Sequence, residues 1–177
     1  VRPESGGWKP SPSVIVGPGH RVASQDFAGL RVAVLGGGDN AFENYLWIRQ
    51  AGAETTHLFA RHIRARSNFV SRACVEDLHV GHYRYDSERL TVNGERYDLV
   101  VVMYGWSPVT ECIQSLDINR DARGFILTDR DTQTSVQGVF AIGEVTRRGH
   151  PCCATSISDG VAAAKAIHHR IERDARV

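Results

Sequence analysis

A glycine-rich turn between a strand pattern and a helix pattern constrains the fold most. This glycine loop follows the apolar run 31–35, precedes the amphipathic stretch 41–50, and consists of Gly36, Gly37, Gly38, Asp39, Asn40 and Ala41. In the spacing Gly-x-Gly-x-x-Ala, the first glycine permits a sharp turn, the second lets a phosphate approach the backbone, and the alanine keeps helix and strand close. An ordinary strand-to-helix connection needs no ligand, but the flanking strand and helix favour a dinucleotide site.

The segments after the glycine loop predict an α/β layer. Four apolar residues fall on one face of a helix that Gly52 can end: Ala41, Tyr45, Leu46 and Ile48. A second strand is predicted over residues 54–59. A strand, a helix and a second strand in this order form a parallel unit, so we expect a Rossmann-like parallel sheet.

Three further strands are predicted over residues 79–85, 89–92 and 97–103, with Asn93-Gly94 as a tight turn between the last two. We expect them to form a small meander appended to the parallel layer. The last of the three is continuously apolar, which is typical of a strand buried on both faces.

The two ends of the chain differ in composition. Residues 1–29 are rich in Pro, Gly and Ser and are predicted as a linker or edge segment, in which Gly17-Pro-Gly19 lies too close to the next strand for a full crossover helix. The C-terminal part predicts two short strands, 125–128 and 138–143, and a helix over 156–173. The predicted inner face of that helix consists of Ile157, Val161, Ala164, Ile167, His168 and Ile171.

The bulk composition is that of an ordinary globular protein. Of the 177 residues, 42% are hydrophobic and 23% charged, which is enough for a sizeable core, and the formal net charge is +1. We expect no nucleic-acid partner from that charge, no membrane span because no apolar run is long enough, and a cytoplasmic location by default. Neither the cysteines nor the histidines show metal-ligand spacing, so no metal site is predicted.

A basic run occupies the position where a nucleotide ribose is recognised. This basic loop, residues 61–66, reads Arg-His-Ile-Arg-Ala-Arg and ends the second predicted strand. A site for NAD presents an acidic residue there, whereas arginine accepts the 2′-phosphate of NADP. No acidic residue lies within residues 55–75 to neutralise the charge. Arg61, His62 and Arg66 therefore predict NADP rather than NAD, with a solvated basic surface as the alternative.

In combination, the motifs resemble those of the two-dinucleotide flavoprotein reductases, the class that contains the low-molecular-weight thioredoxin reductases and the related ferredoxin/flavodoxin–NADP reductases. The resemblance covers about residues 27–173. It rests on four features: the glycine loop with the Glu43 that follows it, Arg61 and Arg66, Gly105-Trp-Ser-Pro-Val-Thr110, and Thr134–Glu144 before an alanine-rich helix. In this order the motifs are highly specific.

The resemblance implies an NAD(P)-binding Rossmann domain at residues 30–110 and the C-terminal portion of an FAD-binding domain at residues 111–177. It also implies hydride transfer from NADPH to FAD and on to an unknown acceptor, in which the cofactors carry the chemistry and the protein positions them. Besides the two loops, the residues implied to contact cofactors are Glu43, Gly105, Gly143, Glu144, Cys153, Ala154 and Thr155.

Two features of these reductases do not occur in this sequence. An N-terminal FAD-binding unit with its own Gly-x-Gly-x-x-Gly loop is missing, so FAD binding requires that this half be supplied. A Cys-x-x-Cys motif ahead of the glycine loop is replaced by Val16–His20 and Ala23–Asp26, which excludes a dithiol reductase of that type. Cys152 and Cys153 are an alternative redox pair, but a disulfide between neighbours is strained, and we interpret them as small buried thiols.

Two functional hypotheses follow. In the first, the chain is the C-terminal part of an FAD- and NADPH-dependent reductase, cut from a longer polypeptide or paired with a separate FAD half. In the second, it is a module that binds NADP or another nucleotide without redox turnover. The first hypothesis leaves residues 111–177 with an apolar patch, so we expect a partner or self-association.

Overall fold

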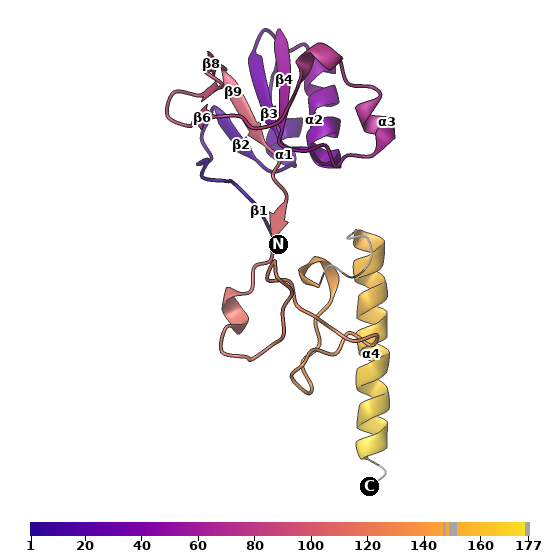
Figure 1. Ribbon diagram of the computed structural model, residues 1–177. Helices are drawn as coiled ribbons and strands as arrows, with labels where there is room; N and C mark the ends of the chain where they lie inside the picture. The colour runs from indigo at the N-terminus through magenta and orange to yellow at the C-terminus, as the bar shows by residue number, and fades with distance from the viewer. Residues whose placement is uncertain (147, 149–151, 176–177) are drawn as a thin grey trace. The chain divides into compact units, whose positions relative to one another are not determined.

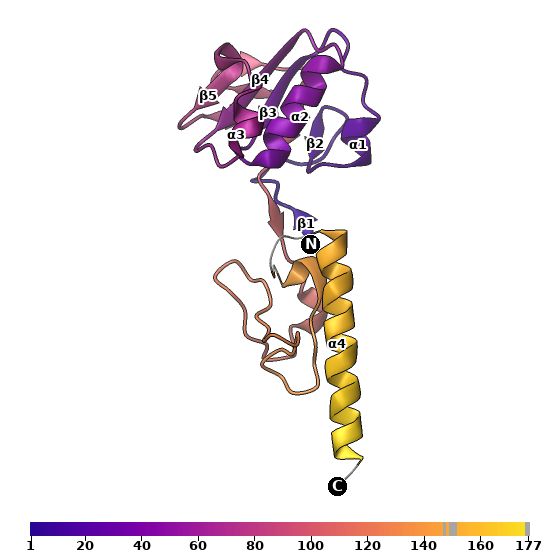
Figure 2. The ribbon, with the colours of Figure 1, turned by 90° about the vertical axis from the view of Figure 1, so that its right-hand side faces the viewer.

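The chain folds into two compact units, which Figures 1 and 2 show as ribbons. The computed structural model describes residues 1–146, 148 and 152–175. The N-terminal unit spans Pro3–Trp106, and the C-terminal unit combines Val1–Arg2 with Ser107–Val177. The two short strands β1 (Arg2–Pro3) and β10 (Trp106–Ser107) pair with each other.

A five-stranded parallel sheet forms the centre of the N-terminal unit, as the sequence predicted. Its strand order is β2-β9-β3-β4-β5. Leu35 of β3 lies opposite both Phe59 of β4 and Val102 of β9, so the carboxyl ends of these three strands meet at one edge. The strands are β2 (Val14–Val16), β3 (Arg31–Leu35), β4 (Thr55–Ala60), β5 (Leu78–Val80) and β9 (Leu99–Val102).

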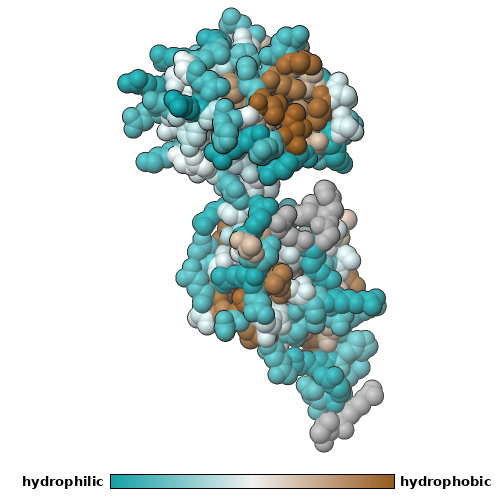
Figure 3. Space-filling model, viewed as in Figure 1, coloured by the Kyte–Doolittle hydropathy of each residue, from teal (hydrophilic) through white to brown (hydrophobic). Residues whose placement is uncertain are grey.

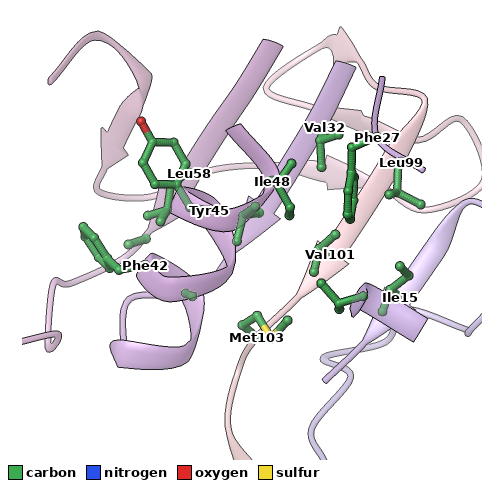
Figure 4. Close-up of a cluster of buried hydrophobic side chains, with 14 residues drawn as sticks. Ile15, Phe27, Val32, Phe42, Tyr45, Ile48, Leu58, Leu99, Val101 and Met103 are labelled. Atoms are coloured by element: carbon green, nitrogen blue, oxygen red, sulfur yellow. The ribbon is translucent and has the colours of Figure 1, made fainter. Parts of the chain in front are cut away.

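Helix α2 (Asp39–Gln50) packs on one face of the sheet, as Figure 4 shows. Its buried residues recur at helical spacing: Ala41, Phe42, Tyr45 and Ile48. They join alternate residues of the strands, such as Val32 and Leu58, in one apolar cluster. The predicted helix is confirmed. It begins at Asp39 rather than Ala41.

Strand β9 corrects the predicted meander. The sequence predicted residues 97–103 as the last meander strand, but Leu99–Val102 lies between β2 and β3 and is parallel to both. All four residues are buried, in agreement with their continuous apolar character. The prediction was wrong because the turn before this strand is a local signal, whereas its partners lie far away along the chain.

A three-stranded antiparallel meander does form, but partly from other residues than predicted: the start of the predicted strand 79–85 lies in β5 of the parallel sheet, and the third meander strand precedes residues 97–103. Its strands are β6 (Tyr85–Asp86), β7 (Thr91–Val92) and β8 (Glu95–Arg96). The predicted turn joins β7 and β8, with Asn93 at φ 51° and Gly94 at φ 83°. Val92 joins a second apolar cluster with Ala33 and Phe59. Successive side chains of a strand point to opposite faces of a sheet, and the neighbours of these two strand residues belong to the cluster beneath α2. The second cluster therefore lies on the face of the sheet opposite α2.

The N-terminal residues contribute to the sheet and its cores. Strand β2 is one of the two edge strands of the sheet, and the short helix α1 (His20–Ala23) follows it. Trp8 and Phe27 are buried in the two clusters, with exposed fractions of 1% and 0%. Between β4 and β5 lie helix α3 (Ser67–Val70) and a 3₁₀ turn (Val75–Asp77). Residues 1–29 thus contain an edge strand, and much of this segment is anchored in the cores.

The described residues of the C-terminal unit form one long helix, α4 (Cys153–Asp174), and mostly irregular loops with two 3₁₀ turns, Glu111–Ile113 and Gly143–Val145. The predicted strands 125–128 and 138–143 are wrong. Their described residues form only isolated bridges, Arg120 with Ile126 and Gln133 with Phe140. A strand needs a neighbour to satisfy its backbone groups, and the described part of this unit supplies no sheet for them.

The apolar stripe of α4 is exposed rather than buried, which corrects the predicted inner face. All its predicted members are exposed, and Ile157 and Ile171 keep 69% and 62% of their surface. The helix buries Ala163 instead. Figure 3 shows hydrophobic residues at the surface of this unit. Among the described residues, no helix is long and apolar enough to cross a membrane. We define the α4 stripe as Ile157, Val161, Ala164, Ile167 and Ile171.

His79 on β5 makes the stability of the N-terminal unit dependent on pH. Its ring stacks on Phe59 at a centroid distance of 4.6 Å and lies 5.0 Å from the ring of His57. Burial, followed by the nearby His57, lowers the pKa of His79 below 6.5. The imidazole of His79 therefore binds a proton more readily in the unfolded chain than in the folded chain. The free energy of unfolding is consequently highest above about pH 6.5 and declines as the pH falls through the pKa of His79 in the folded chain.

We expect His79→Gln to flatten the decline of the thermal midpoint between about pH 7 and pH 5, because it removes the group that titrates. Thermal unfolding across that range checks this. Substitution of the exposed His82 by Gln is the matched control and should leave the decline unchanged. An unaltered decline in His79→Gln would contradict the assignment.

Candidate functional site

The glycine loop lies at the carboxyl end of β3, where α2 begins. Gly36 has φ 145°, and a side chain there would collide with the carbonyl oxygen of Met103. A side chain at Gly37 would collide with the carbonyl oxygen of His62. At Gly38 no atom lies within 4 Å of the position of an added Cβ. The chain therefore fills the space beside the first two glycines and leaves the space beside the third open.

The open space adjoins the N-terminus of α2. Gly38 is the N-cap residue, with extended backbone at φ −95° and ψ 177°, and no side chain caps the helix within the described residues. The first N–H groups of a helix have no partner inside it, and the positive end of the helix dipole attracts anions. This geometry suits a phosphate group.

The basic loop is fastened to the glycine loop. The N–H groups of Arg64 and Ala65 donate to the carbonyl oxygen of Gly37 at 2.6 and 2.9 Å. The carboxylate of Asp39 accepts from the N–H of Arg66 at 2.8 Å and from its Nε at 2.7 Å. The two loops follow neighbouring parallel strands, so they form one surface at the carboxyl edge of the sheet, where ligands of α/β proteins bind.

A cleft of about 370 Å³ lies beside the two loops. Its lining residues all belong to the N-terminal unit: Glu4, Gly6, Gly36, Gly37, Arg61, His62, Arg64, Tyr83, Tyr85 and Tyr104. The cleft thus combines cationic side chains and backbone from the loops with a group of aromatic rings. Such a combination can hold phosphates at one place and a flat ring system at another.

The three tyrosines were missed by the sequence analysis. The Tyr83 hydroxyl donates to the Tyr104 hydroxyl at 2.9 Å, and Tyr85 stacks on Trp8 with ring centroids 5.0 Å apart. Burial raises the pKa of Tyr83 and Tyr104, so both hydroxyls stay protonated at neutral pH. Only Tyr104 carried a usable signal, because it comes shortly after the carboxyl end of β9.

The structure gathers some of the predicted residues at the cleft and leaves others outside its lining. Two glycines, Arg61 and His62 line it. Arg66 is tied to the glycine loop instead, and Glu43 is exposed on α2. Gly105 has φ 114°, and its carbonyl oxygen accepts the N–H of Glu4 at 2.9 Å.

A second group of predicted residues lies in the C-terminal unit. Gly143 and Glu144 begin a 3₁₀ turn, and the N–H of Gly143 donates to the Asp159 carboxylate on α4 at 3.1 Å. Cys153, Ala154 and Thr155 form the first turn of α4. The structure therefore brings the 3₁₀ turn and the start of α4 together. Glu144 is exposed.

The helix α4 begins with a reciprocal cap. The side chain of Thr155 and the N-cap residue Cys152 exchange hydrogen bonds, so the helix starts earlier than the predicted Ser156. Hydrogen bonds from the backbone N–H and then the side chain of Thr155 lower the pKa of the Cys152 thiol. Both Cys152 and Cys153 are exposed free thiols, which corrects their interpretation as buried residues. Within the described chain, no cluster of three or more His, Cys, Asp or Glu side chains could hold a metal ion.

Comparison with known proteins decides the family. Residues 18–166 match the family model described as pyridine nucleotide-disulphide oxidoreductase. The chain belongs to this family. The matched region includes the glycine loop, the basic loop and the second group of residues in the C-terminal unit, so the predicted resemblance is confirmed.

Relatives of the chain include thioredoxin reductases. The chain is 27% identical over 165 residues to thioredoxin reductase of Bacillus subtilis, covering 82% of this chain and 52% of the relative. It is 28% identical over 155 residues to thioredoxin reductase of Mycoplasma pneumoniae, covering 77% and 49%. The chain thus spans about half the length of the curated relatives it matches.

Solved structures share the fold. Thioredoxin reductase of Lactococcus lactis superposes with a TM-score of 0.64 at 24% identity, covering 81% of this chain and 53% of that one. Bacillithiol disulfide reductase Bdr of Bacillus cereus gives a TM-score of 0.67 at 21% identity, covering 81% and 51%. The mixed α/β fold predicted from the sequence is therefore confirmed, and these two reductase structures share it.

Proposed function

We propose that the chain is part of an FAD-dependent NADPH oxidoreductase. Residues 30–110 are the NADP-binding domain of this proposal, and residues 111–177 are the C-terminal portion of the FAD-binding domain. When bound, the cofactors supply the redox chemistry, hydride transfer from nicotinamide to flavin and onward to an acceptor, while the protein positions them.

One observation carries the NADPH assignment. The basic loop is fastened to Gly37 and Asp39, the residues on either side of Gly38, and Gly38 itself adjoins open space. The pyrophosphate fits the helix N-terminus, and Arg61, His62 and Arg66 are the proposed contacts of the 2′-phosphate. The remaining proposed contacts of the nicotinamide dinucleotide are the glycine-loop residues, Glu43 and Gly105.

The proposed flavin contacts are the second group of residues, Gly143, Glu144, Cys153, Ala154 and Thr155. Support comes from their arrangement, because the 3₁₀ turn and the first turn of a 22-residue helix lie together. Gly143 has φ 74°, a conformation that favours glycine. These residues make only part of a flavin site, and the proposal assigns the rest to an FAD-binding half supplied by further polypeptide.

The α4 stripe supports a partner for the C-terminal unit. Contiguous exposed apolar surface of this kind marks an interaction site. The proposal places on it either the FAD-binding half or, in the chain alone, a second copy. The polypeptide length of the relatives favours the former, because this chain matches only about half of them.

A nucleotide-binding module without redox turnover is the second candidate. The observation that favours it is the self-contained N-terminal unit, which holds both loops, the cleft and its own apolar clusters. A flavin absorbance spectrum in the purified chain would decide for the reductase. Binding of NADPH without flavin in a longer polypeptide that includes this chain would favour the module, because the chain alone holds only part of the proposed flavin site.

Arg61→Ala with Arg66→Ala tests the proposed 2′-phosphate contact. We expect the affinity for NADPH to fall at least about tenfold more than the affinity for NADH, because only NADPH carries the 2′-phosphate. Fluorescence titration of both cofactors measures this. Arg72→Ala with Arg84→Ala removes the same charge from exposed positions and is the matched control. Equal losses for both cofactors would contradict the assignment.

A further inference from the structure

The Asp39 carboxylate has an unexpected partner. Both of its oxygens are used by Arg66: Oδ1 accepts the backbone N–H at 2.8 Å, and Oδ2 accepts Nε at 2.7 Å. The two residues are 27 positions apart in the chain. Asp39 lies in the first turn of α2 and Arg66 ends the basic loop, so this pair is the side-chain clasp between the two loops.

The clasp leaves the ligand-binding end of Arg66 available. Asp39 takes Nε, and the described residues offer no hydrogen bond or ion pair to the two terminal nitrogens. The guanidinium carbon lies 5.3 Å from the centroid of the Phe69 ring, which supports one face of the group. The side chain remains 68% exposed. A terminal fork held this way can bind a phosphate with two parallel hydrogen bonds.

A carboxylate is otherwise a poor choice at this position. The pyrophosphate of the proposed ligand binds at the same helix terminus, and like charges repel. A carboxylate that only stabilised the helix would weaken the binding of every dinucleotide. An acid that orients the arginine for a 2′-phosphate offsets that repulsion, but only for NADPH.

We propose that Asp39 is a positioning residue for the 2′-phosphate of NADPH, acting through Arg66. This inference rests on the proposed function. Asp39 fixes Nε and the backbone of Arg66, so the terminal nitrogens are oriented before the ligand arrives and less side-chain entropy is lost on binding. Asp39 therefore sets the preference between the two cofactors without contacting the 2′-phosphate.

Asp39→Asn tests the role, because the amide keeps an oxygen for the backbone N–H but lacks the charge and the second acceptor for Nε. We expect the NADPH dissociation constant to rise about tenfold while that of NADH stays the same or falls, measured by fluorescence titration. The matched control is Glu54→Gln, the same change at an exposed residue before β4, at the opposite end of that strand from the basic loop. It should leave both constants unchanged.

A double-mutant cycle separates orientation from simple charge. If Asp39 acts through Arg66, then adding Asp39→Asn to the Arg66→Ala variant should not weaken NADPH binding any further. The inference would be overturned if Asp39→Asn raised the affinity for both cofactors equally, or if it left the preference for NADPH unchanged. If Asp39→Asn lowers the thermal midpoint, the same titrations are made with Asp39→Ser, which keeps a hydroxyl acceptor, and the same change in the two dissociation constants is expected. Failure of the unmodified chain to bind either cofactor would instead overturn the proposed function.

Discussion

A serine in place of Gly38 should lower the affinities for NADPH and for NADH alike, by at least about tenfold, while leaving the fold intact. The backbone at this N-cap position is extended, and serine caps helices well, so helix α2 keeps or gains stability. The added side chain enters the one open space of the glycine loop, where the proposed pyrophosphate approaches. Titration of both cofactors together with thermal unfolding measures the two effects.

Gly37→Ser is the matched control, for which we expect a loss of stability instead of an intact fold. Its side chain would meet the carbonyl oxygen of His62 and the side chain of Ala60, both within the packed chain. We therefore expect a loss of folding free energy of about 1–3 kcal/mol, the usual cost of overpacking, and displacement of the basic loop. If Gly38→Ser also unfolded the chain, or if it bound both cofactors normally, the assignment of the open space to the ligand would be wrong.

Val161→Asp should weaken the association that the α4 stripe drives. Val161 lies between Ile157 and Ala164 on this stripe and is 54% exposed, so the chain alone tolerates a charge there. In an interface the same charge would be buried without a partner, which costs several kcal/mol. We expect the dissociation constant of the associated form to rise at least about tenfold with no change in helix content.

Light scattering at increasing concentration, with and without the substitution, checks this expectation. Ser158→Asp introduces the same side chain on the same helix outside the α4 stripe and should leave association unchanged. A strictly monomeric unmodified chain at high concentration would contradict the proposed role of the stripe.

The parts of the fold that depend on local patterns could be predicted from the sequence. The glycine loop, helix α2 and the turn at Asn93-Gly94 each have a chemical cause within a few residues. Strand β9 could not be placed in this way. Its apolar run indicated burial, but its pairing with β2 and β3 depends on residues distant in the chain.

The C-terminal unit shows the limit of periodicity. The α4 stripe was predicted correctly as one helical face, but whether a face is buried depends on what packs against it. The described residues place no such element there, so Ile157 and Ile171 are exposed. The same lack of a neighbour leaves the predicted strands at 125–128 and 138–143 as isolated bridges.

The site was predictable in its chemistry but not in its contacts. The spacing of the glycines and the charge of the basic loop indicated a dinucleotide, and the family match agrees with that cofactor class. The clasp between Asp39 and Arg66 joins residues whose proximity only the parallel pairing of β3 and β4 creates. The tyrosines of the cleft come from two separate segments of the chain, residues 83–85 and residue 104, so no single motif contains them.

Equilibrium titration of the unmodified chain with NADPH and with NADH tests the central claim most directly. Cofactor fluorescence reports binding without a knowledge of the electron acceptor. We predict that NADPH binds at least about tenfold more tightly than NADH, because the basic loop offers its cations to the 2′-phosphate. Equal affinities, or no binding of either cofactor, would contradict the claim.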